Sequence, residues 1–381
     1  MTPEWPLWSA EHSPSDAEPP RCPSCGQPVS PSASFCESCG GAVIPTAPAS
    51  PPVDQPGDAS SQTQRLGARQ SQALICTACG GTIDADGYCT TCGTKAPSPE
   101  DHYRQSPTDW VGGVCDRGIQ HSRNEDALAL WADGDQAVLV VCDGVSSSTD
   151  AHAAAAVAAE ALRSGLVEAV AALTEQGDAA AAMARAFVDV TTAANQAIIA
   201  VTAADSANAA SATLATAVVL GPDIHFANLG DSRVYFLTPS DGVLLSLDDS
   251  MAQAFIAQGM ERSEAEALPR AHAITKWLGR DAVDIVPRVG SYRPTEPGWV
   301  VVCSDGLWNY ASEPAALAAQ LTAASVGSED PTQIAAGLVQ WANGQGGRDN
   351  ITVALARCPA PSAPTTLEAD SSTLEEHPEH G

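Results

Sequence analysis

The sequence predicts an α+β fold, a four-layer sandwich in which two sheets pack face to face and helices cover both outer surfaces. Two patterns predict it. Apolar segments rich in Val, Leu and Ile occur in blocks, and the blocks alternate with pairs of longer helix-like segments. Within a block, Gly, Pro and Asp separate the apolar segments, which is typical of antiparallel strands. This order favours an α-β-β-α arrangement over a doubly wound parallel sheet.

The periodicity of apolar residues predicts the elements in chain order. Strands are predicted at 110–119, 126–132, 137–145, 212–220, 223–230, 232–238, 242–247, 283–291, 300–304 and 351–357. Helices are predicted at 150–175, 178–205, 250–268, 313–325 and 331–343. The four short strands that follow one another after residue 211 indicate an antiparallel meander.

Composition divides the chain into regions of different character. Only the Ala- and Val-rich middle has the length and apolar content of a large core. The predicted regions are a disordered tail at 1–19, cysteine-rich modules at 20–44 and 73–96, a Pro/Ser-rich linker at 45–72, one large domain at 108–358 and an acidic disordered tail at 359–381.

Charge and hydropathy exclude some classes of protein. The chain has 18 Lys and Arg against 46 Asp and Glu, a net charge of −28, which argues against nonspecific binding to DNA or anionic membranes. No apolar stretch reaches the ~18 residues of a membrane span. The N-terminus lacks the basic region and apolar core of a secretory signal. A cytoplasmic protein is therefore expected.

Eight of the twelve cysteines form four C-x-x-C pairs. Two pairs in each cysteine-rich module predict a tetrahedral Cys₄ zinc site, because Gly after the second Cys frees the backbone to turn its amides toward the sulfurs. A disulfide framework needs an oxidising compartment, and iron is a minor alternative for the same ligands. The predicted zinc ligands are Cys22, Cys25, Cys36 and Cys39 in the first module and Cys76, Cys79, Cys89 and Cys92 in the second.

Each module is too small to hold a core, so metal binding would supply its folding energy. The modules resemble zinc ribbons. The few basic residues around them are Arg21, Arg65, Arg69 and Lys95, without the clusters that phosphate-backbone binding requires. Docking to a protein partner, or a purely structural role, is therefore favoured over nucleic-acid binding.

Three aspartates stand at the ends of separate apolar runs: Asp143 in AVLVVCDG, Asp305 in WVVVCSDG and Asp349 in GGRDNITV. A fourth, Asp231, lies in ANLGDSRVYF. A strand that delivers a carboxylate to its end places a charge where apolar packing stops, and several such charges are tolerated together only if cations neutralise them. The four aspartates therefore predict one folded metal site.

The motifs DRGIQHSRNEDA, VVCDGV, SATLATAVV, NLGDSRVY, LSLDDS, ITKWLG, VVCSDGLW and GGRDNITV occur in the order and approximate spacing of the metal-dependent type 2C serine/threonine protein phosphatases. The resemblance covers about residues 108–357. It implies a β-sandwich flanked by helix pairs, with two Mn²⁺ or Mg²⁺ ions at one end and a possible third.

The resemblance also implies roles for individual residues. Asp143 would bridge both metals, and the carbonyl of Gly144 would bind the second. Asp305 and Asp349 would complete the first metal site. Asp231 would form the third, weaker site together with Asp305.

Three further residues would support these ligands. Glu125 and Asp126 would hold metal-bound waters and so orient the reactive solvent. Asn350 would fix the loop beside Asp349 by hydrogen bonding. Two hard cations a few Å apart can share one water and make it hydroxide-like near neutral pH, so that it attacks phosphorus without a phosphoenzyme. The chain has no C-x₅-R motif of a thiol phosphatase, and the cysteines inside apolar strands are predicted to be core residues.

The sequence departs from the family in the group that binds the substrate phosphate. Where members commonly carry Arg, this chain has His121. Either protonated His121 or the neighbouring Arg123 would bind the phosphate, and a structural histidine is the alternative.

A second set of departures concerns the leaving group and the substrate. VSSS follows Gly144 where a histidine is common, so protonation of the leaving group would come from a metal-bound water or from His121. DDS at 248–250 replaces D-H-S. Residues 249–279, the flap region, would cover the site, with Arg270, His272 and Lys276 as possible contacts for a phosphopeptide or as solvated charges.

The predicted function is a protein serine/threonine phosphatase that acts in bacterial signalling against a Ser/Thr kinase, with phosphoproteins as substrates. The alternative is a weakly active or inactive phosphatase fold that docks signalling partners through its zinc ribbons. The intact set of carboxylates favours the enzyme, because a binding module has no need to keep a repulsive cluster.

Overall fold

The structure, a computed structural model, describes residues 75–76, 79–84, 87–93, 96, 98–174 and 177–359. The chain divides into two compact units between residues 97 and 98. The predicted first zinc module, both predicted tails apart from Pro359, and the linker at 45–72 lie outside the described residues. The boundaries of the large domain at 108–358 stay a prediction. Among the described helices, none is both long and apolar enough to cross a membrane.

The first sheet of the larger unit has six antiparallel strands. Their order across the sheet is β1 (His102–Gln105), β2 (Val111–Asp116), β13 (Ile351–Cys358), β12 (Gly298–Cys303), β8 (Arg233–Leu237) and β9 (Gly242–Leu244). The last strand that the structure describes, β13, therefore lies in the middle of this sheet, between β2 and β12.

The second sheet has five antiparallel strands. Their order is β11 (Arg288–Tyr292), β7 (Asp223–Leu229), β6 (Leu214–Leu220), β4 (Gln136–Asp143) and β3 (Asp126–Asp133). A small two-stranded sheet pairs β5 (Ser211–Ala212) with β10 (Leu278–Gly279).

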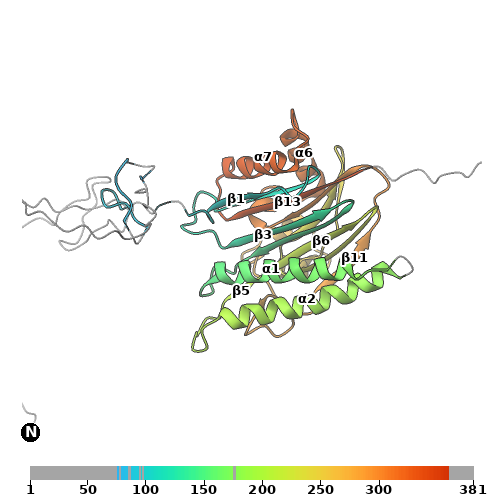
Figure 1. Cartoon of the computed structure of the whole chain (residues 1–381), viewed down its shortest axis with the longest axis horizontal. Helices are drawn as coiled ribbons and strands as arrows, with labels where there is room; N and C mark the ends of the chain where they lie inside the picture. Colours follow the sequence, from blue (N-terminus) through green and yellow to red (C-terminus); the bar gives the residue numbers. More distant parts are fainter. Residues whose placement is uncertain are drawn as a thin grey trace, which may run out of the picture. The chain divides into compact units, whose positions relative to one another are not determined.

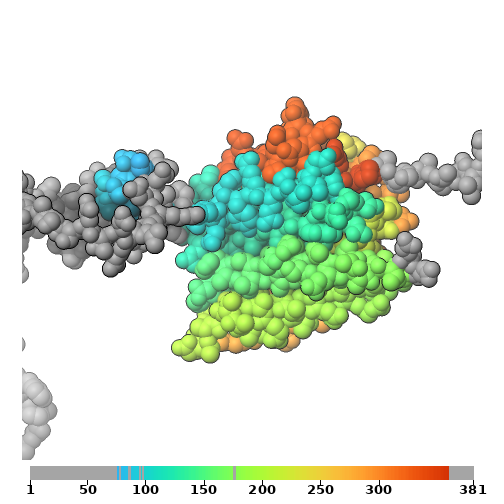
Figure 2. All heavy atoms as spheres, viewed as in Figure 1, coloured from blue at the N-terminus to red at the C-terminus, as the bar shows by residue number. Residues whose placement is uncertain are grey.

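Helix pairs form the two outer layers, as Figure 1 shows. The second sheet is covered by α1 (Ala151–Ala171) and α2 (Ala179–Val201), and the first by α6 (Pro314–Ala324) and α7 (Pro331–Gly344). In the space-filling view, the red helices α6 and α7 and the green helices α1 and α2 lie on opposite sides of the strands (Figure 2). Three short helices follow strands along the chain: α3 (Met251–Ile256) and α4 (Arg262–Glu266) come after β9, and α5 (Asp305–Trp308) comes after β12.

Alternation along the strands builds three apolar layers. In β4, Val138, Val140 and Cys142 pack with α1 and α2, whereas Leu139 and Val141 point into the layer between the two sheets. This follows from the two-residue period of a strand, which turns successive side chains to opposite faces. A third layer packs β12 and β13 against α6 and α7. The predicted four-layer α-β-β-α sandwich is therefore confirmed.

The predicted elements and the observed ones differ in a few places. The helix predicted at 250–268 is two short helices, interrupted at Gly259, which has a φ of 96°. The strand predicted at 283–291 starts later, at Arg288. The edge strand β1, HYRQ, has no apolar alternation, and α5 spans only 4 residues, so neither gives a periodic signal.

The strand directions collect the candidate site residues at one end of the sandwich. In the β3–β4 hairpin, Asp126 at the start of β3 is paired with Asp143 at the end of β4, and Asp133 is paired with Gln136 at the other end. The turn between them begins with Gly134, whose φ of 56° suits the first position of a tight hairpin turn. We call the end that carries Asp126 and Asp143 the acidic end.

We predict that Leu139→Ala destabilises the domain by about 2–5 kcal/mol, because it opens a cavity between the two sheets. Leu139 is fully buried. The matched control is Leu247→Ala, the same change at a side chain that is 41% exposed, which should cost about 0.5 kcal/mol or less. Urea unfolding of the two variants checks this, and equal losses would contradict the three-layer core.

Candidate functional site

Carboxylates from five segments of the chain meet at the acidic end. Asp143 ends β4 and Asp126 begins β3. Asp305 follows β12 as the first residue of α5, Asp349 precedes β13, and Asp231 lies between β7 and β8. Like charges directly opposite each other in a sheet are destabilising, so the Asp126–Asp143 pair alone calls for compensation.

The carboxyl groups at the acidic end raise one another's pKa. Burial raises the pKa of Asp143 well above its usual range, and the charges of Asp126, Asp305, Asp231 and Asp349 raise it further. Burial, followed by the charge of Asp305, likewise raises the pKa of Asp231 well above its usual range. Burial and the charge of Asp349 raise the pKa of Asp305 to about 6. The cluster therefore favours protons or bound cations over a fully ionised, empty state.

Asp126 is the most enclosed of these groups apart from Asp231. Its Oδ2 accepts hydrogen bonds from Ser304 Oγ and Thr352 Oγ1, both at 2.7 Å. Its Oδ1 is buried without a hydrogen-bond partner. Burial raises the pKa of Asp126 to about 7 although the two hydroxyls lower it. A buried oxygen without a partner is costly. A water or a cation bound at Oδ1 would remove this cost.

The donor set fits hard divalent cations. Carboxylate and carbonyl oxygens are the ligands that Mg²⁺ and Mn²⁺ prefer. Among the described residues, only the second cysteine module brings three or more ligand atoms within 4.8 Å of one another. No three carboxylates at the acidic end meet this criterion, so the described residues do not form a single closed cage there.

Gly144 lies where two backbone segments approach closely. Its N–H donates to the carbonyl of Glu125 at 3.0 Å. A Cβ at this position would lie 2.6 Å from Glu125 O and 2.7 Å from Ala151 O. Only glycine leaves space here, and the backbone of residues 143–144 can therefore lie against the start of α1.

Asn350 connects the loop after β2 to the start of β13. Its Nδ2 donates to the carbonyls of Arg117 at 2.7 Å and Arg123 at 3.0 Å, and its Oδ1 accepts from the N–H of Glu125 at 2.8 Å. The Asn350 N–H donates to Asp349 Oδ1 at 2.8 Å. One buried side chain thus holds the loop that carries Glu125 beside Asp349.

The two residues predicted to bind substrate phosphate lie in different surroundings. His121 Nε2 lies 3.2 Å from Asp349 Oδ1, at the acidic end. Arg123 Nη1 lies 3.0 Å from His152 Nδ1, beside the start of α1. The structure therefore places His121, and not Arg123, in contact with a predicted metal ligand. Their roles toward phosphate stay predictions.

A buried cation that was not predicted from the sequence lies next to the cluster. Arg233, 1% exposed, lies two residues after Asp231, and its charge lowers the pKa of both Asp231 and Asp305 against the rise from burial. It forms an ion pair with Asp248 at 2.6 Å. The signal was an arginine inside the apolar strand RVYFL, because a buried charge must be paired.

The cysteines inside the strands are unsuited to nucleophilic chemistry. Cys115, Cys142 and Cys303 are all fully buried, as predicted. Burial raises the pKa of Cys115 to about 12 and raises the pKa of Cys142 and of Cys303 as well. The thiolate is the reactive form, so these thiols stay inert.

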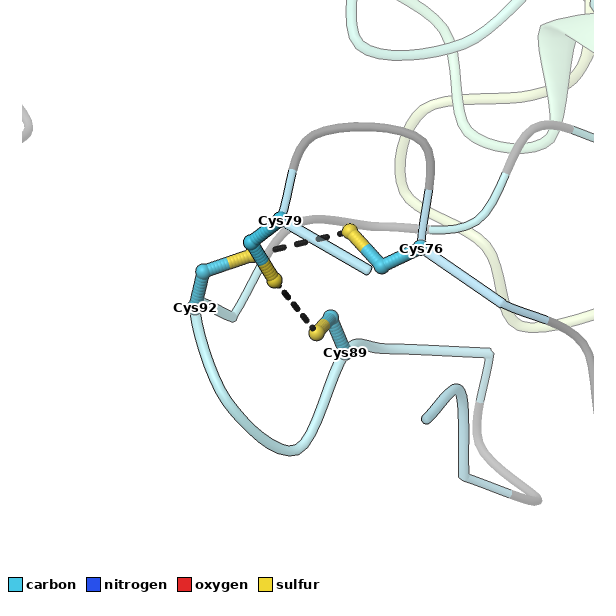
Figure 3. A group of neighbouring side chains, drawn as sticks. All are labelled: Cys76, Cys79, Cys89 and Cys92. Atoms are coloured by element: carbon cyan, nitrogen blue, oxygen red, sulfur yellow. Dashed lines mark hydrogen bonds between the residues drawn. The ribbon is translucent and has the colours of Figure 1, made fainter. Parts of the chain in front are cut away.

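The smaller unit contains a separate cluster of four cysteines, drawn in Figure 3. The Sγ atoms of Cys76, Cys79, Cys89 and Cys92 all lie within 4.8 Å of one another. Two equivalent turns hold them, with Gly80 N–H donating to Cys76 O and Gly93 N–H donating to Cys89 O, both at 2.9 Å. Both glycines have a φ of 72°. No disulfide joins the described cysteines, and their arrangement is compatible with a tetrahedral zinc site.

Comparison with known proteins identifies the family. The family model described as "Protein phosphatase 2C" matches residues 118–343, and the chain belongs to this family.

Similar proteins come from several bacteria. Protein phosphatase PhpP of Streptococcus pneumoniae (strain D39) is 30% identical over 144 residues, which is 38% of this chain and 56% of PhpP. The match thus spans little more than half the length of that relative. Serine/threonine phosphatase stp of Listeria welshimeri is 26% identical over 243 residues, 63% of this chain and 92% of the relative.

Solved structures agree with the fold. The serine/threonine phosphatase of S. agalactiae has a TM-score of 0.55 and 22% identity, with 67% of this chain and 100% of that chain covered. The phosphatase MsPP of Mycobacterium smegmatis, solved in complex with cacodylate, has a TM-score of 0.52 and 26% identity, with 65% and 97% covered.

We predict that Asn350→Ala destabilises the domain by about 1–3 kcal/mol, because it removes the donor to the carbonyls of Arg117 and Arg123 and the acceptor of the Glu125 N–H, in hydrogen bonds that are partly buried. Faster amide hydrogen exchange in residues 117–125, measured by mass spectrometry, should accompany the loss. Exchange in that loop that stays at the wild-type rate would show that Asn350 does not hold it.

Proposed function

We propose that this chain is a metal-dependent protein phosphatase that hydrolyses phosphoserine and phosphothreonine. The observation that carries the proposal is the set of mutually repelling carboxylates at the acidic end of a type 2C phosphatase fold, of which Asp126 and Asp231 are buried and the others half-buried. Such a cluster is costly without cations. The relatives named serine/threonine phosphatases support the substrate class.

The predicted ligands suit this reaction. Two bound Mn²⁺ or Mg²⁺ ions would supply a nucleophilic water near neutral pH and neutralise the charge that develops on the phosphoryl group. Asp143 and the Gly144 carbonyl would hold them together with Asp305 and Asp349. Asp231, buried beside Arg233, would hold a further ion.

Other residues of the acidic end would orient solvent and substrate. Asp126 is fixed through Oδ2 by two hydroxyls, so its unpartnered Oδ1 can accept a hydrogen bond from a water in the site. Glu125 would share this role from the loop that Asn350 holds. His121 is the side chain best placed to contact the phosphate or to donate a proton to the leaving oxygen, because it adjoins Asp349.

The second cysteine module is proposed to bind one Zn²⁺. Four sulfurs within reach of one ion, in two turns of the same geometry, support zinc as a structural ion. We further propose that Cys22, Cys25, Cys36 and Cys39 bind a second Zn²⁺, and that both ribbons dock a protein partner. That partner would be a Ser/Thr kinase or one of its cytoplasmic phosphoprotein substrates, in bacterial signalling.

We predict that Asp143→Ala and Asp305→Ala each lower Mn²⁺-dependent hydrolysis of an aryl phosphate by more than about 100-fold, because each removes a ligand of the metal pair. The matched control is Asp133→Ala, since Asp133 lies on β3 at the opposite end from Asp126. That control should keep wild-type turnover. Activity that survives both ligand substitutions, in protein with a wild-type circular dichroism spectrum, would overturn the proposed site.

The zinc proposal has its own test. Metal analysis of the purified full chain should find two Zn²⁺ per chain, and the double substitution Cys76→Ser with Cys79→Ser should reduce this to one, because two thiolates cannot close a tetrahedral site. Cys358→Ala, a change at a buried cysteine of β13, should leave the zinc content unchanged. A full chain without zinc would contradict the proposal.

A further inference from the structure

The flap region is fastened to the sandwich at its base. Asp249 N–H donates to the carbonyl of Gly230, and Thr275 N–H donates to the carbonyl of Asp249, both at 2.7 Å. Arg288 on β11 donates to Asp249 Oδ1 from Nε at 3.0 Å and from Nη2 at 2.8 Å. Asp249 stands where the resemblance leads one to expect histidine, and here it serves as an anchor.

Leu278, at the end of the flap region, belongs to the apolar layer of α1 and α2, whereas the middle of the region forms a separate cluster. This small apolar cluster is made of Ala252, Ala265 and Ala271, with Phe255, Ile256, Met260 and Leu268 around them. A cluster of this size cannot hold a segment rigid, because segments with few buried apolar contacts open at low cost. Polar contacts therefore contribute to holding the middle of the flap region in its orientation.

Glu266, on α4, makes the closest polar contacts between the far part of the flap region and the sandwich, and Arg262 of the same helix adds an ion pair with Glu313 at 3.6 Å. Its Oε1 accepts from Arg233 Nη2 at 3.0 Å, from Ser312 Oγ at 2.8 Å and from Arg262 Nη1 at 3.2 Å. Burial opposes ionisation of Glu266, but these hydrogen bonds outweigh it and hold its pKa below the usual range. The side chain is therefore an ionised acceptor at neutral pH.

Arg233 receives Glu266 in a fully occupied site. Its Nε and Nη2 donate to Asp248, its Nη1 donates to Tyr235 Oη at 3.2 Å and to Ser312 Oγ at 2.9 Å, and its remaining Nη2 hydrogen reaches Glu266. All five N–H donors of the guanidinium thus have partners. Lysine, with three donors and no plane, could not replace it.

Trp308 joins this ion-pair cluster to the metal-binding carboxylates. The guanidinium carbon of Arg233 lies 3.5 Å from the centroid of the Trp308 ring. Trp308 Nε1 donates to the carbonyl of Asp231 at 2.9 Å, and the indole belongs to α5, the helix that starts at Asp305. His272 of the flap region lies over the same ring, with centroids 5.8 Å apart. Glu266 and His272 of the flap region therefore contact the stacked pair of Arg233 and Trp308.

We propose that Glu266 is a positioning residue that, through Arg233 and Trp308, locks the flap region in one orientation beside the acidic end. This inference rests on the proposed phosphatase function and deepens it. A phosphorylated peptide is longer than a small phosphate ester, so it can reach beyond the acidic end to the neighbouring flap region, which the small ester cannot. Glu266 therefore affects binding of phosphopeptides and not the chemical step.

The test uses the full-length chain with Glu266→Ala, and Glu264→Ala as the matched control, because Glu264 is an exposed glutamate on the same short helix. Glu266→Ala leaves Arg233 paired with Asp248, so the buried charge keeps a partner. We expect amide exchange in residues 251–271 to rise by about tenfold or more. We also expect the KM for a phosphothreonine peptide to rise by ~3–10-fold, with kcat and KM for an aryl phosphate within about twofold of wild type.

Glu266→Gln is the conservative comparison, because its amide oxygen can still accept hydrogen bonds. Its KM for the peptide should lie between those of wild type and Glu266→Ala. Exchange at the wild-type rate in Glu266→Ala would overturn the anchor. Equal loss of turnover on peptide and aryl phosphate would overturn the positioning role, since Glu266 would then act on the chemistry or on the metals. The exchange measurement needs no catalysis, so a wild-type chain without hydrolysis would reject the proposed phosphatase while the anchor is still judged by exchange.

Discussion

Repulsion among carboxylates at one end of two stacked sheets is the constraint on which the rest of the structure depends. Apolar packing between sheets and helices supplies the stability that allows these charges to be gathered. The surrounding polar groups each offset part of the repulsion. Ser304 and Thr352 hold one oxygen of Asp126, and Arg233 provides positive charge behind Asp231 and Asp305. Divalent cations would neutralise the negative charge that remains.

The sequence predicted the layers well because their signal is local. Alternation in AVLVVCDG specifies both faces of β4, and the Ala-rich segments specify the helix pair. The aspartates could also be predicted from the sequence, since a carboxylate after an apolar run can be recognised without knowledge of the fold. The contacts of Glu266 and Asp249 could not be found in this way. They join residues far apart in the chain, such as Arg233 and Glu266, and only the folded chain shows which charges become partners.

Two kinds of candidate metal site coexist in this chain, and their ligands keep them chemically distinct. The smaller unit presents soft sulfur ligands, and the acidic end presents hard oxygens, which select different ions. Cys142 immediately precedes Asp143, so a soft ligand lies one residue from a hard one. Strand alternation separates them, because the thiol of Cys142 packs toward α1 and α2. Zinc bound by mixed sulfur and oxygen ligands is thereby disfavoured at the acidic end.

The hairpin that pairs Asp126 with Asp143 gives its turn an unexpected importance. Each strand of the hairpin is 8 residues long, so Gly134 and Asp135 lie roughly 25 Å from the carboxylates along the strands. A strand turns successive side chains to opposite faces, and a one-residue change of register would rotate one aspartate away from the other. The length of the turn therefore sets the register that places Asp126 opposite Asp143. An inserted residue in this exposed turn would disturb little around it and yet would separate two carboxylates at the opposite end of the domain.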